Sequence, residues 1–218
     1  MSASIYQTLE RTGYRFGRGV IRLMQIKPGE KGSIIDAFLV TQTLKSDEIK
    51  YEALSYVWGD SSVRTAIKLC GQMFSVTKNL EAALQQIRLT DEIRTLWVDA
   101  ICINQENVVE RNSQVLLMNE IYGKSMKVLV WLGSDSLAAK ELEAFLKSMN
   151  DSEHINRCVK KRGNSSSACS NGLSSLRAIL NKSWWERTWT LQEILLARDA
   201  EILCGDFKVP WEDFYRAF

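Results

Sequence analysis

Residues 95–132 have the sequence TLWVDAICINQENVVERNSQVLLMNEIYGKSMKVLVWL, and this stretch decides the fold. It opens with a nearly continuous apolar run, Thr95–Ile103, which is typical of a strand covered on both faces in a parallel sheet. Asn107 and Glu110 then have the spacing of a helix N-cap and its third helical residue. A helix to about Tyr122 follows, and the apolar run Lys127–Leu132 predicts a second buried strand. Strand, helix and strand in this order indicate an α/β sheet.

Upstream, the aromatic and apolar run Tyr51–Trp58 predicts a third buried strand, which ends at a turn. The stripe of an amphipathic helix follows at the spacing i, i+3, i+4, i+7: Leu80, Ala83, Leu84 and Ile87. In the helix that ends near Tyr122, Val115 and Met118 share one side with that tyrosine. We expect the three buried strands to be adjacent and parallel, as the mostly parallel central sheet of a three-layer α/β fold.

Three β-hairpins are predicted beside this core. Val20–Lys27 and Ser33–Thr41 are apolar stretches separated by Pro-Gly-Glu-Lys-Gly. Within Ala66–Val76, Gly71-Gln72 fits a type II′ turn with glycine at its first position. A similar Cys-Gly pair lies within Ala200–Val209, and the shared turn chemistry explains this likeness better than duplication does.

The remaining segments give the domain layout. Residues 1–19 form an N-terminal arm, and residues 20–218 form one domain. Asp135–Met149 and Leu173–Leu180 look helical, and the polar Asn150–Gly172 stretch between them predicts a variable loop insertion. Ser183–Ala197 predicts one further helix, with Trp185, Trp189, Leu196 and either Gln192 or Glu193 near one face. The chain stops at residue 218 inside an apparent helix without a C-cap, so we expect it to be the front part of a longer protein.

Composition narrows the functional classes. The chain has 218 residues, 45% of them hydrophobic and 25% charged, which is typical of a globular protein. The net charge of +2 argues against a dedicated nucleic-acid binder. One histidine and five cysteines without a C-x-x-C pair argue against a zinc site, and we expect reduced thiols in a cytoplasmic protein. No signal peptide or membrane-spanning run is visible. We therefore expect no metal, no cofactor, no nucleic acid and no membrane partner.

Several segments stand in a recognisable order: IRLMQIKPGE, YEALSYVWGD, VTKNLEAAL, LWVDAICINQENVVERNSQVLLMNEIY, VLVWLG, and WWERTWTLQEILLA with ILCG. In this order they resemble the HET domain, the heterokaryon-incompatibility domain of filamentous fungi, over about Val20 to Trp211. The resemblance implies a domain at the front of a large multidomain protein. It implies fungal non-self recognition (allorecognition), with programmed cell death when genetically different hyphae fuse.

HET domains look distantly similar to TIR domains, many of which cleave NAD at the nicotinamide–ribose bond with a helical glutamate. The TIR pattern begins with a strand ending in Ser-x-x-Gly-x-Asp, for which Ser55–Asp60 (SYVWGD) stands here. It ends with a Ser-Trp-x-x-x-Glu type of helix, for which Ser183-Trp184 through Glu193 stands here, although the spacing is not a clean match. The resemblance thus implies Glu193 as the catalytic residue. Trp189, one helical turn away, would exclude water and stack on the ligand.

Ligands of open α/β sheets bind beyond the carboxyl ends of the strands. The residues expected there are Ser55, Trp58, Gly59, Asp60, Asp99, Asn104, Gln105 and Arg111. Trp58 offers a stacking face, and Gly59 allows a ligand to approach the backbone closely. Asn104 and Gln105 can bind amides and hydroxyls, and Arg111 can meet a pyrophosphate beside a helix N-terminus. These residues predict a site for NAD or a related nucleotide, with NAD as a substrate.

Simpler interpretations stand beside each of these. Glu193 can be a solvated or salt-bridged helix residue, and the two candidate stacking tryptophans can be core residues. Asp99, an acid inside an apolar run, can be a structural partner of Arg111 or of a backbone turn, because a free buried charge is costly. A hydrolase that pairs Cys102 with His154 is disfavoured, and Cys102 is interpreted as a small buried hydrophobe. For the whole domain, the alternative to an enzyme is a signalling module that acts by self-association or by binding downstream domains and partner proteins.

Overall fold

The computed structural model describes residues 5–6, 19–46, 48–135, 140, 143, 174 and 176–216. The predictions for the N-terminal arm, for all but the first residue of Asp135–Met149 as a helix, and for Asn150–Gly172 as a loop lie almost entirely outside these residues. Of the predicted Leu173–Leu180 helix, residues 174 and 176–180 are described, and they are helical.

Within the described residues, one sheet of nine strands forms the centre of the fold, in the order β5-β4-β2-β1-β6-β3-β7-β8-β9. The strands are β1 Val20–Ile26, β2 Asp36–Thr43, β3 Glu52–Tyr56, β4 Arg64–Leu69, β5 Gln72–Thr77, β6 Arg94–Trp97, β7 Lys127–Trp131, β8 Ala200–Cys204 and β9 Phe207–Pro210.

Four neighbouring strands of this sheet, β6, β3, β7 and β8, are parallel. β3 lies between β6 and β7, so the three predicted buried strands are adjacent and parallel as expected. β1–β2, β4–β5 and β8–β9 are antiparallel hairpins, which confirms the three predicted ones. The mixed α/β class is therefore confirmed, and the carboxyl ends of β6, β3 and β7 share one edge of the sheet.

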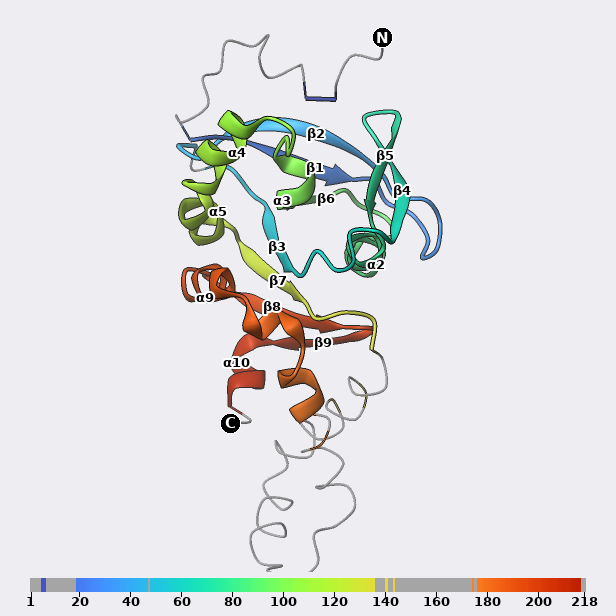
Figure 1. The fold of residues 1–218 in the computed structure, drawn as a ribbon, viewed down its shortest axis with the longest axis vertical. Coiled ribbons are helices and arrows are strands. Elements are labelled where there is room, and N and C mark those ends of the chain that lie inside the picture. The colour runs from blue at the N-terminus through green and yellow to red at the C-terminus, as the bar shows by residue number, and fades with distance from the viewer. Residues whose placement is uncertain are drawn as a thin grey trace, which may run out of the picture.

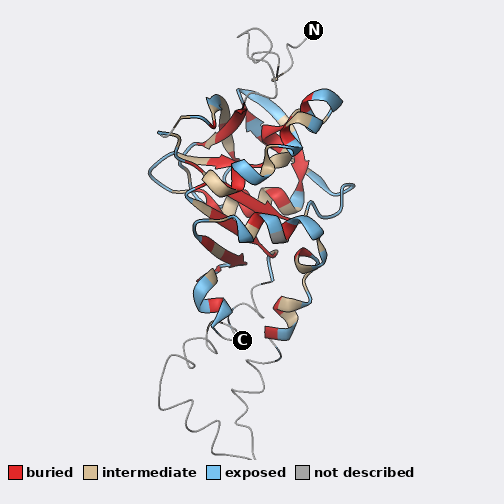
Figure 2. Cartoon of the chain, turned by 90° about the vertical axis from the view of Figure 1, so that its left-hand side faces the viewer, coloured by how far each residue is buried: buried red, intermediate tan, exposed pale blue. Residues whose placement is uncertain are grey.

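The helices fill the connections between these strands. They are α2 Lys78–Ile87, α3 Asp99–Cys102, α4 Val108–Val115, α5 Met118–Lys124, η1 Ser183–Glu186 (a 3₁₀ turn), α9 Thr188–Leu195 and α10 Trp211–Tyr215. In Figure 1, α4, α5 and α9 follow one another on the left of the molecule, and α2 lies on the right, beside β4 and β5. Figure 2 shows that the buried residues are concentrated on the strands. None of the helices in the described part is long and apolar enough to cross a membrane.

Helix α2 matches its predicted pattern closely. The Thr77 side chain accepts the Leu80 amide and caps the first turn. The buried residues of α2 are the four of the predicted stripe, at 0–1% exposure. Asn107 likewise caps α4 by accepting the Glu110 amide at 3.1 Å, as the capping spacing predicts.

The prediction of a strand through Ile103 is wrong. β6 ends at Trp97, and Asp99 opens the short helix α3. The physical reason is local, because the Asp99 carboxylate accepts the Ala100 amide at 2.7 Å and so satisfies a backbone donor at the start of that helical turn. Asp99 thus sits at the carboxyl end of β6 rather than inside the strand.

The single helix predicted to reach Tyr122 is two helices, which divide at Leu116 and Leu117. The prediction that Val115 lies on the same side as Tyr122 is also wrong, since Val115 is 38% exposed and Tyr122 is buried. The buried residues of α4 are polar: Glu110 and Gln114. The spacing of apolar residues could not predict this buried face of α4, because the face is polar and binds an arginine side chain and a backbone carbonyl on β1.

The turn between β4 and β5 is Cys70-Gly71 rather than Gly71-Gln72. Leu69 pairs with Gln72 in the ladder, so the two residues between them form the turn. Both have positive φ, 50° at Cys70 and 79° at Gly71, which is the geometry of a type I′ turn. The hairpin was therefore predicted correctly and its turn type was not.

The single helix predicted over Ser183–Ala197 divides at Arg187, whose φ of −83° and ψ of 127° are extended. The Arg187 guanidinium donates to the Tyr56 carbonyl at 2.5 Å, and the Thr190 hydroxyl donates to the Arg187 carbonyl at 2.6 Å. The break lets α9 start in a new direction. It also places Arg187 at the carboxyl end of β3.

Candidate functional site

Glu193 lies on α9 and is buried, with 2% of its surface exposed. The Ser55 hydroxyl, on β3, donates a hydrogen bond to its carboxyl group. Ser55 in turn accepts a hydrogen bond of 2.8 Å from the indole nitrogen of Trp184. Because an indole N–H can only donate, the one hydroxyl proton of Ser55 is directed at Glu193. The result is a one-way chain from Trp184 through Ser55 to the acid.

Burial raises the pKa of Glu193 above its ordinary value. The hydrogen bond from Ser55 and the positive charge of Arg187 oppose this rise, and the negative charge of Asp99 adds to it. The Tyr122 hydroxyl, on α5, donates to the Leu54 carbonyl at 3.4 Å, and its proximity to the carboxyl group also favours the charged form of Glu193. A carboxyl group in this setting holds its proton more strongly than a surface glutamate does.

Asp99 is the second acid of the site. Its carboxylate accepts the indole N–H of Trp58 at 2.9 Å and the Ala100 amide at 2.7 Å. The Tyr56 hydroxyl also hydrogen-bonds it. Burial raises its pKa, and these hydrogen bonds together with the Arg187 charge oppose the rise. Two structural partners of Asp99 were considered from the sequence, a backbone turn and Arg111. Asp99 accepts the Ala100 amide of the backbone turn, whereas Arg111 donates to the Gln105 carbonyl at 3.2 Å.

Arg187 connects the two acids electrostatically, because its charge acts on both Asp99 and Glu193. Sequence analysis missed Arg187, and it also missed Tyr56, Tyr122 and the hydrogen bond from Trp184 to Ser55. The available signal for Arg187 was weak: a single cation just before the helix that carries the candidate glutamate. Its role depends on the contact with β3, which no sequence spacing encodes.

A pocket of about 520 Å³ opens beside this cluster. One wall has Tyr56, the last residue of β3, and Trp58 just after the strand, together with Asn104 and Gln105 from the segment between α3 and α4. The opposite wall is the β4–β5 hairpin, with Arg64 and Phe74 among its residues; Ile5 and Tyr6 also line the pocket. Glu193 is not among the lining residues, since it faces Ser55. Tyr56 and Trp58 line the pocket, and Asp99, which accepts the indole N–H of Trp58, does not.

The structure brings some predicted site residues together and leaves others apart. Ser55 and Glu193 are buried and hydrogen-bonded to each other, and the half-buried Asp99 acts on Glu193 through its charge; Trp58, Asn104 and Gln105 line the pocket. Four predicted residues line neither, and each has its own surroundings, as follows.

Gly59 has a φ of 74°, and a Cβ there would meet the Asn79 side chain at 3.1 Å. Its conformational freedom therefore serves a contact within the protein. Asp60 is exposed and accepts the amide and hydroxyl of Ser62, at 2.8 and 2.6 Å. Arg111 is exposed, and Trp189 is 50% exposed.

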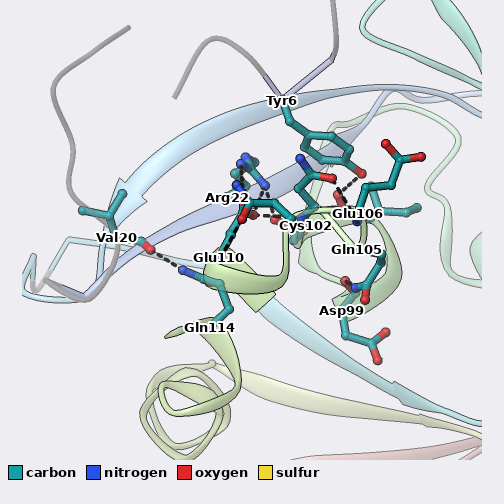
Figure 3. A network of polar contacts seen from close by, with 12 residues as sticks. Tyr6, Val20, Arg22, Asp99, Cys102, Gln105, Glu106, Glu110 and Gln114 are labelled. Carbon is teal, nitrogen blue, oxygen red and sulfur yellow. Dashed lines mark hydrogen bonds and ion pairs between the residues drawn. The ribbon is translucent and has the colours of Figure 1, made fainter. Parts of the chain in front are cut away.

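A buried ion pair supports the wall that carries Asn104 (Figure 3). The Arg22 guanidinium, on β1, binds both carboxylate oxygens of Glu110 at 2.5 and 3.0 Å and donates to the Cys102 carbonyl at 3.0 Å. Glu110 also accepts the Asn104 amide at 2.8 Å. The Tyr6 ring lies over the guanidinium at 4.6 Å. These contacts fix the backbone between α3 and α4, and with it the position of the pocket wall.

Two other chemistries were considered from the sequence. Burial raises the pKa of the Cys102 thiol to about 12, so this group is a poor nucleophile at neutral pH. His154, its candidate base, lies outside the described residues. Among the residues that the structure describes, no group of three or more potential ligands could hold a metal ion.

Comparisons with known proteins agree with the motifs. The family model described as heterokaryon incompatibility protein (HET) matches residues 51–193, which contain β3, α3 and Glu193. The chain is 31% identical, over 195 residues, to "Heterokaryon incompatibility protein 6, OR allele" of Neurospora crassa. The match covers 71% of this chain and 28% of that relative, so the chain spans only part of the relative's length. No solved structure matches significantly. The chain therefore belongs to the heterokaryon incompatibility (HET) family.

Proposed function

We propose that this HET domain acts in fungal non-self recognition and cell death, and that it does so by cleaving NAD at the nicotinamide–ribose bond in a TIR-like manner. The observation that supports this proposal best is the buried Glu193, held by Ser55 at the carboxyl end of β3 and electrostatically coupled to Asp99. A solvated glutamate on the surface of a helix would be neither buried nor hydrogen-bonded to a serine.

The chemistry needs few groups. The bond between the ribose carbon and the pyridinium nitrogen breaks, and its electron pair leaves with neutral nicotinamide. An ionised Glu193 stabilises the positive charge that develops on the ribose. Water then attacks the ribose carbon and loses a proton to the carboxylate or to solvent, which gives ADP-ribose. The raised pKa of Glu193 suits it to take up that proton.

Access to Glu193 requires a movement, because only 2% of it is exposed. Glu193 does not line the pocket, so the nicotinamide end of NAD reaches the acid when neighbouring side chains or α9 shift. We therefore expect the isolated domain to be slow and its activity to rise when the protein is concentrated or crowded.

The experiment incubates the purified chain with NAD at low and high protein concentration and measures nicotinamide and ADP-ribose by chromatography. Glu193→Gln should lower the rate by about 100-fold or more, the usual range for a lost acid–base group. Glu92→Gln, a change at an exposed turn residue, is the matched control and should match the parent. If folded Glu193→Gln consumes NAD at the parent rate, the assignment of Glu193 is wrong.

A second candidate, a non-enzymatic module that acts by self-association, is favoured by a different observation. Large apolar side chains on or beside α4 and α9 are exposed: Val109 at 73%, Leu116 at 84%, Trp189 at 50% and Leu195 at 78%. If concentrated protein releases no nicotinamide while Leu195→Ser abolishes its self-association, this second candidate is the better account.

A further inference from the structure

We propose that the pocket between the β4–β5 hairpin and the segment 104–106 binds a nucleoside monophosphate, with Arg64 on the phosphate and Glu106 on the ribose hydroxyls. The ligand class rests on the proposed function only in that NAD contains such a unit, its AMP half. The pocket is large enough, since small-molecule sites measure roughly 300–1,000 Å³ and this one measures about 520 Å³.

The aromatic side chains of the pocket suit a flat base. Trp58 is 43% exposed, and its indole nitrogen is held by Asp99 at 2.9 Å, so the orientation of the ring is fixed while part of it stays open. Phe74 lies on the opposite wall, where Tyr6 contacts it edge-on with ring centroids 6.4 Å apart. An aromatic base between these walls would bury apolar surface on both faces.

Arg64 is a cation that is already oriented. Its Nε donates to the Ser75 hydroxyl at 2.8 Å, and one Nη donates to the Ser75 carbonyl at 2.7 Å. A guanidinium has five N–H donors, so three remain for a ligand. Arg64 forms no ion pair with any carboxylate in the described part of the chain. A phosphate would give it the charged partner that it lacks there.

Glu106 decides against a simple anion site. Its side chain is exposed and lines the same pocket, and Figure 3 shows its carboxylate directed away from the Arg22–Glu110 pair. A carboxylate repels a bare phosphate, but it accepts hydrogen bonds from the hydroxyls of a ribose, as acidic residues do in dinucleotide sites. A ligand that satisfies both Arg64 and Glu106 carries a phosphate and a diol, which a nucleotide does.

The alternative cation, Arg111, is poorly placed for this role. It is not among the residues that line the pocket, and one of its Nη atoms donates to the Gln105 carbonyl at 3.2 Å. The pyrophosphate contact expected of Arg111 from the sequence therefore passes to Arg64 on β4, a strand that precedes Arg111 by some forty residues.

Calorimetric titration of the purified chain tests the proposal with AMP, adenosine and 2′-deoxy-AMP, none of which has a nicotinamide bond to cleave. The parent should bind AMP more tightly than the other two. Arg64→Gln should weaken AMP binding about tenfold, the usual effect of a lost charged hydrogen bond, and leave adenosine binding unchanged. Arg64→Lys should restore part of the AMP affinity, and Glu106→Gln should remove the preference for AMP over 2′-deoxy-AMP.

Arg198→Gln, at an exposed arginine outside the pocket lining, is the control and should bind like the parent. The proposal is overturned if the parent binds none of the three ligands, or if Arg111→Gln weakens AMP binding while Arg64→Gln does not. If Arg64→Gln cleaves NAD at the parent rate, the proposal for this pocket is wrong and the proposed function is unaffected. AMP binding that depends on Arg64, without any NAD cleavage, would support the pocket and count against the proposed function.

Discussion

Ser55 makes two hydrogen bonds with one hydroxyl group, and both partners are buried. Ser55→Ala leaves the Trp184 indole nitrogen without its acceptor and removes a donor from Glu193. A buried polar group that loses its partner costs about 1–3 kcal/mol. We therefore expect Ser55→Ala to lower the free energy of unfolding by about that amount in urea denaturation. Ser134→Ala, at an exposed serine, should change it little; equal effects at both positions would contradict the hydrogen-bond chain.

The two acids give the stability a pH dependence with a definite sign. Burial raises the pKa of Glu193 above its ordinary 4.5 and that of Asp99 above 3.8, so the folded protein binds these protons more strongly than the unfolded chain. Their stabilising contribution is complete below the ordinary values, and it is lost as the pH rises through the folded-state pKa values.

Glu193→Gln has no such proton to lose. Its free energy of unfolding should therefore fall less than that of the parent as the pH rises from about 4.5 toward neutrality. Asp99→Asn should show the same flattening, because the same cause acts on it. Denaturation curves recorded at several pH values measure the two slopes. A parent slope equal to that of Glu193→Gln would mean that the carboxyl group is ionised normally in the fold.

At the scale of elements, the β4–β5 turn offers a test that involves no packing. Gly71 has a φ of 79°, and a Cβ added there would meet nothing within 4 Å. Gly71→Ala should therefore cost only the backbone penalty of a left-handed conformation, about 1–2 kcal/mol. The matched control is Gly123→Ala on α5, where the contacts are ordinary and a helix favours alanine. Thermal unfolding should show a lower Tm for the first variant and no loss for the second; the reverse order would contradict the turn assignment.

The elements also show how far the sequence alone could predict this fold. Continuous apolar runs predicted β3, β6 and β7, because a strand buried on both faces is apolar throughout. Apolar residues at helical spacing predicted α2, because only one stripe of that helix is buried. The start of α3 at Asp99 and the break at Arg187 were missed, since each depends on a polar side chain whose partners are decided by the local turn or by another strand.

The site was less predictable than the fold for the same reason. Ser55 and Glu193 came from a family resemblance rather than from spacing, and the structure adds contacts with Trp184 and Tyr122. Arg64 had no signal at all, because only the arrangement of β4 and β5 around the pocket gives it a role. Residues that act across a sheet become visible only when the strand order is known.

At the scale of the whole molecule, the Arg22–Glu110 pair joins distant parts of the chain. Arg22 lies on β1 and is 4% exposed, and Glu110 lies on α4 and is 2% exposed. Through the Cys102 carbonyl and the Asn104 amide, the pair also holds the segment that leads to the pocket. The antiparallel half of the sheet is thereby tied to the helices that follow its parallel half.

Breaking this pair should therefore lower the free energy of unfolding of the whole domain. Glu110→Ala leaves the Arg22 charge buried without a counter-ion, which costs about 3–5 kcal/mol, whereas replacing both partners by apolar residues of similar volume costs far less. We expect the single variant to lower the urea midpoint strongly and the double variant Arg22→Met/Glu110→Leu to recover part of the loss. Glu92→Ala, at an exposed turn, serves as the control for loss of a carboxylate. A free energy of unfolding of Glu110→Ala within about 1 kcal/mol of the parent value would be the range of a surface ion pair. In that case β1 and α4 are not joined by a desolvated ion pair, and the wall that carries Asn104 must be held by other contacts.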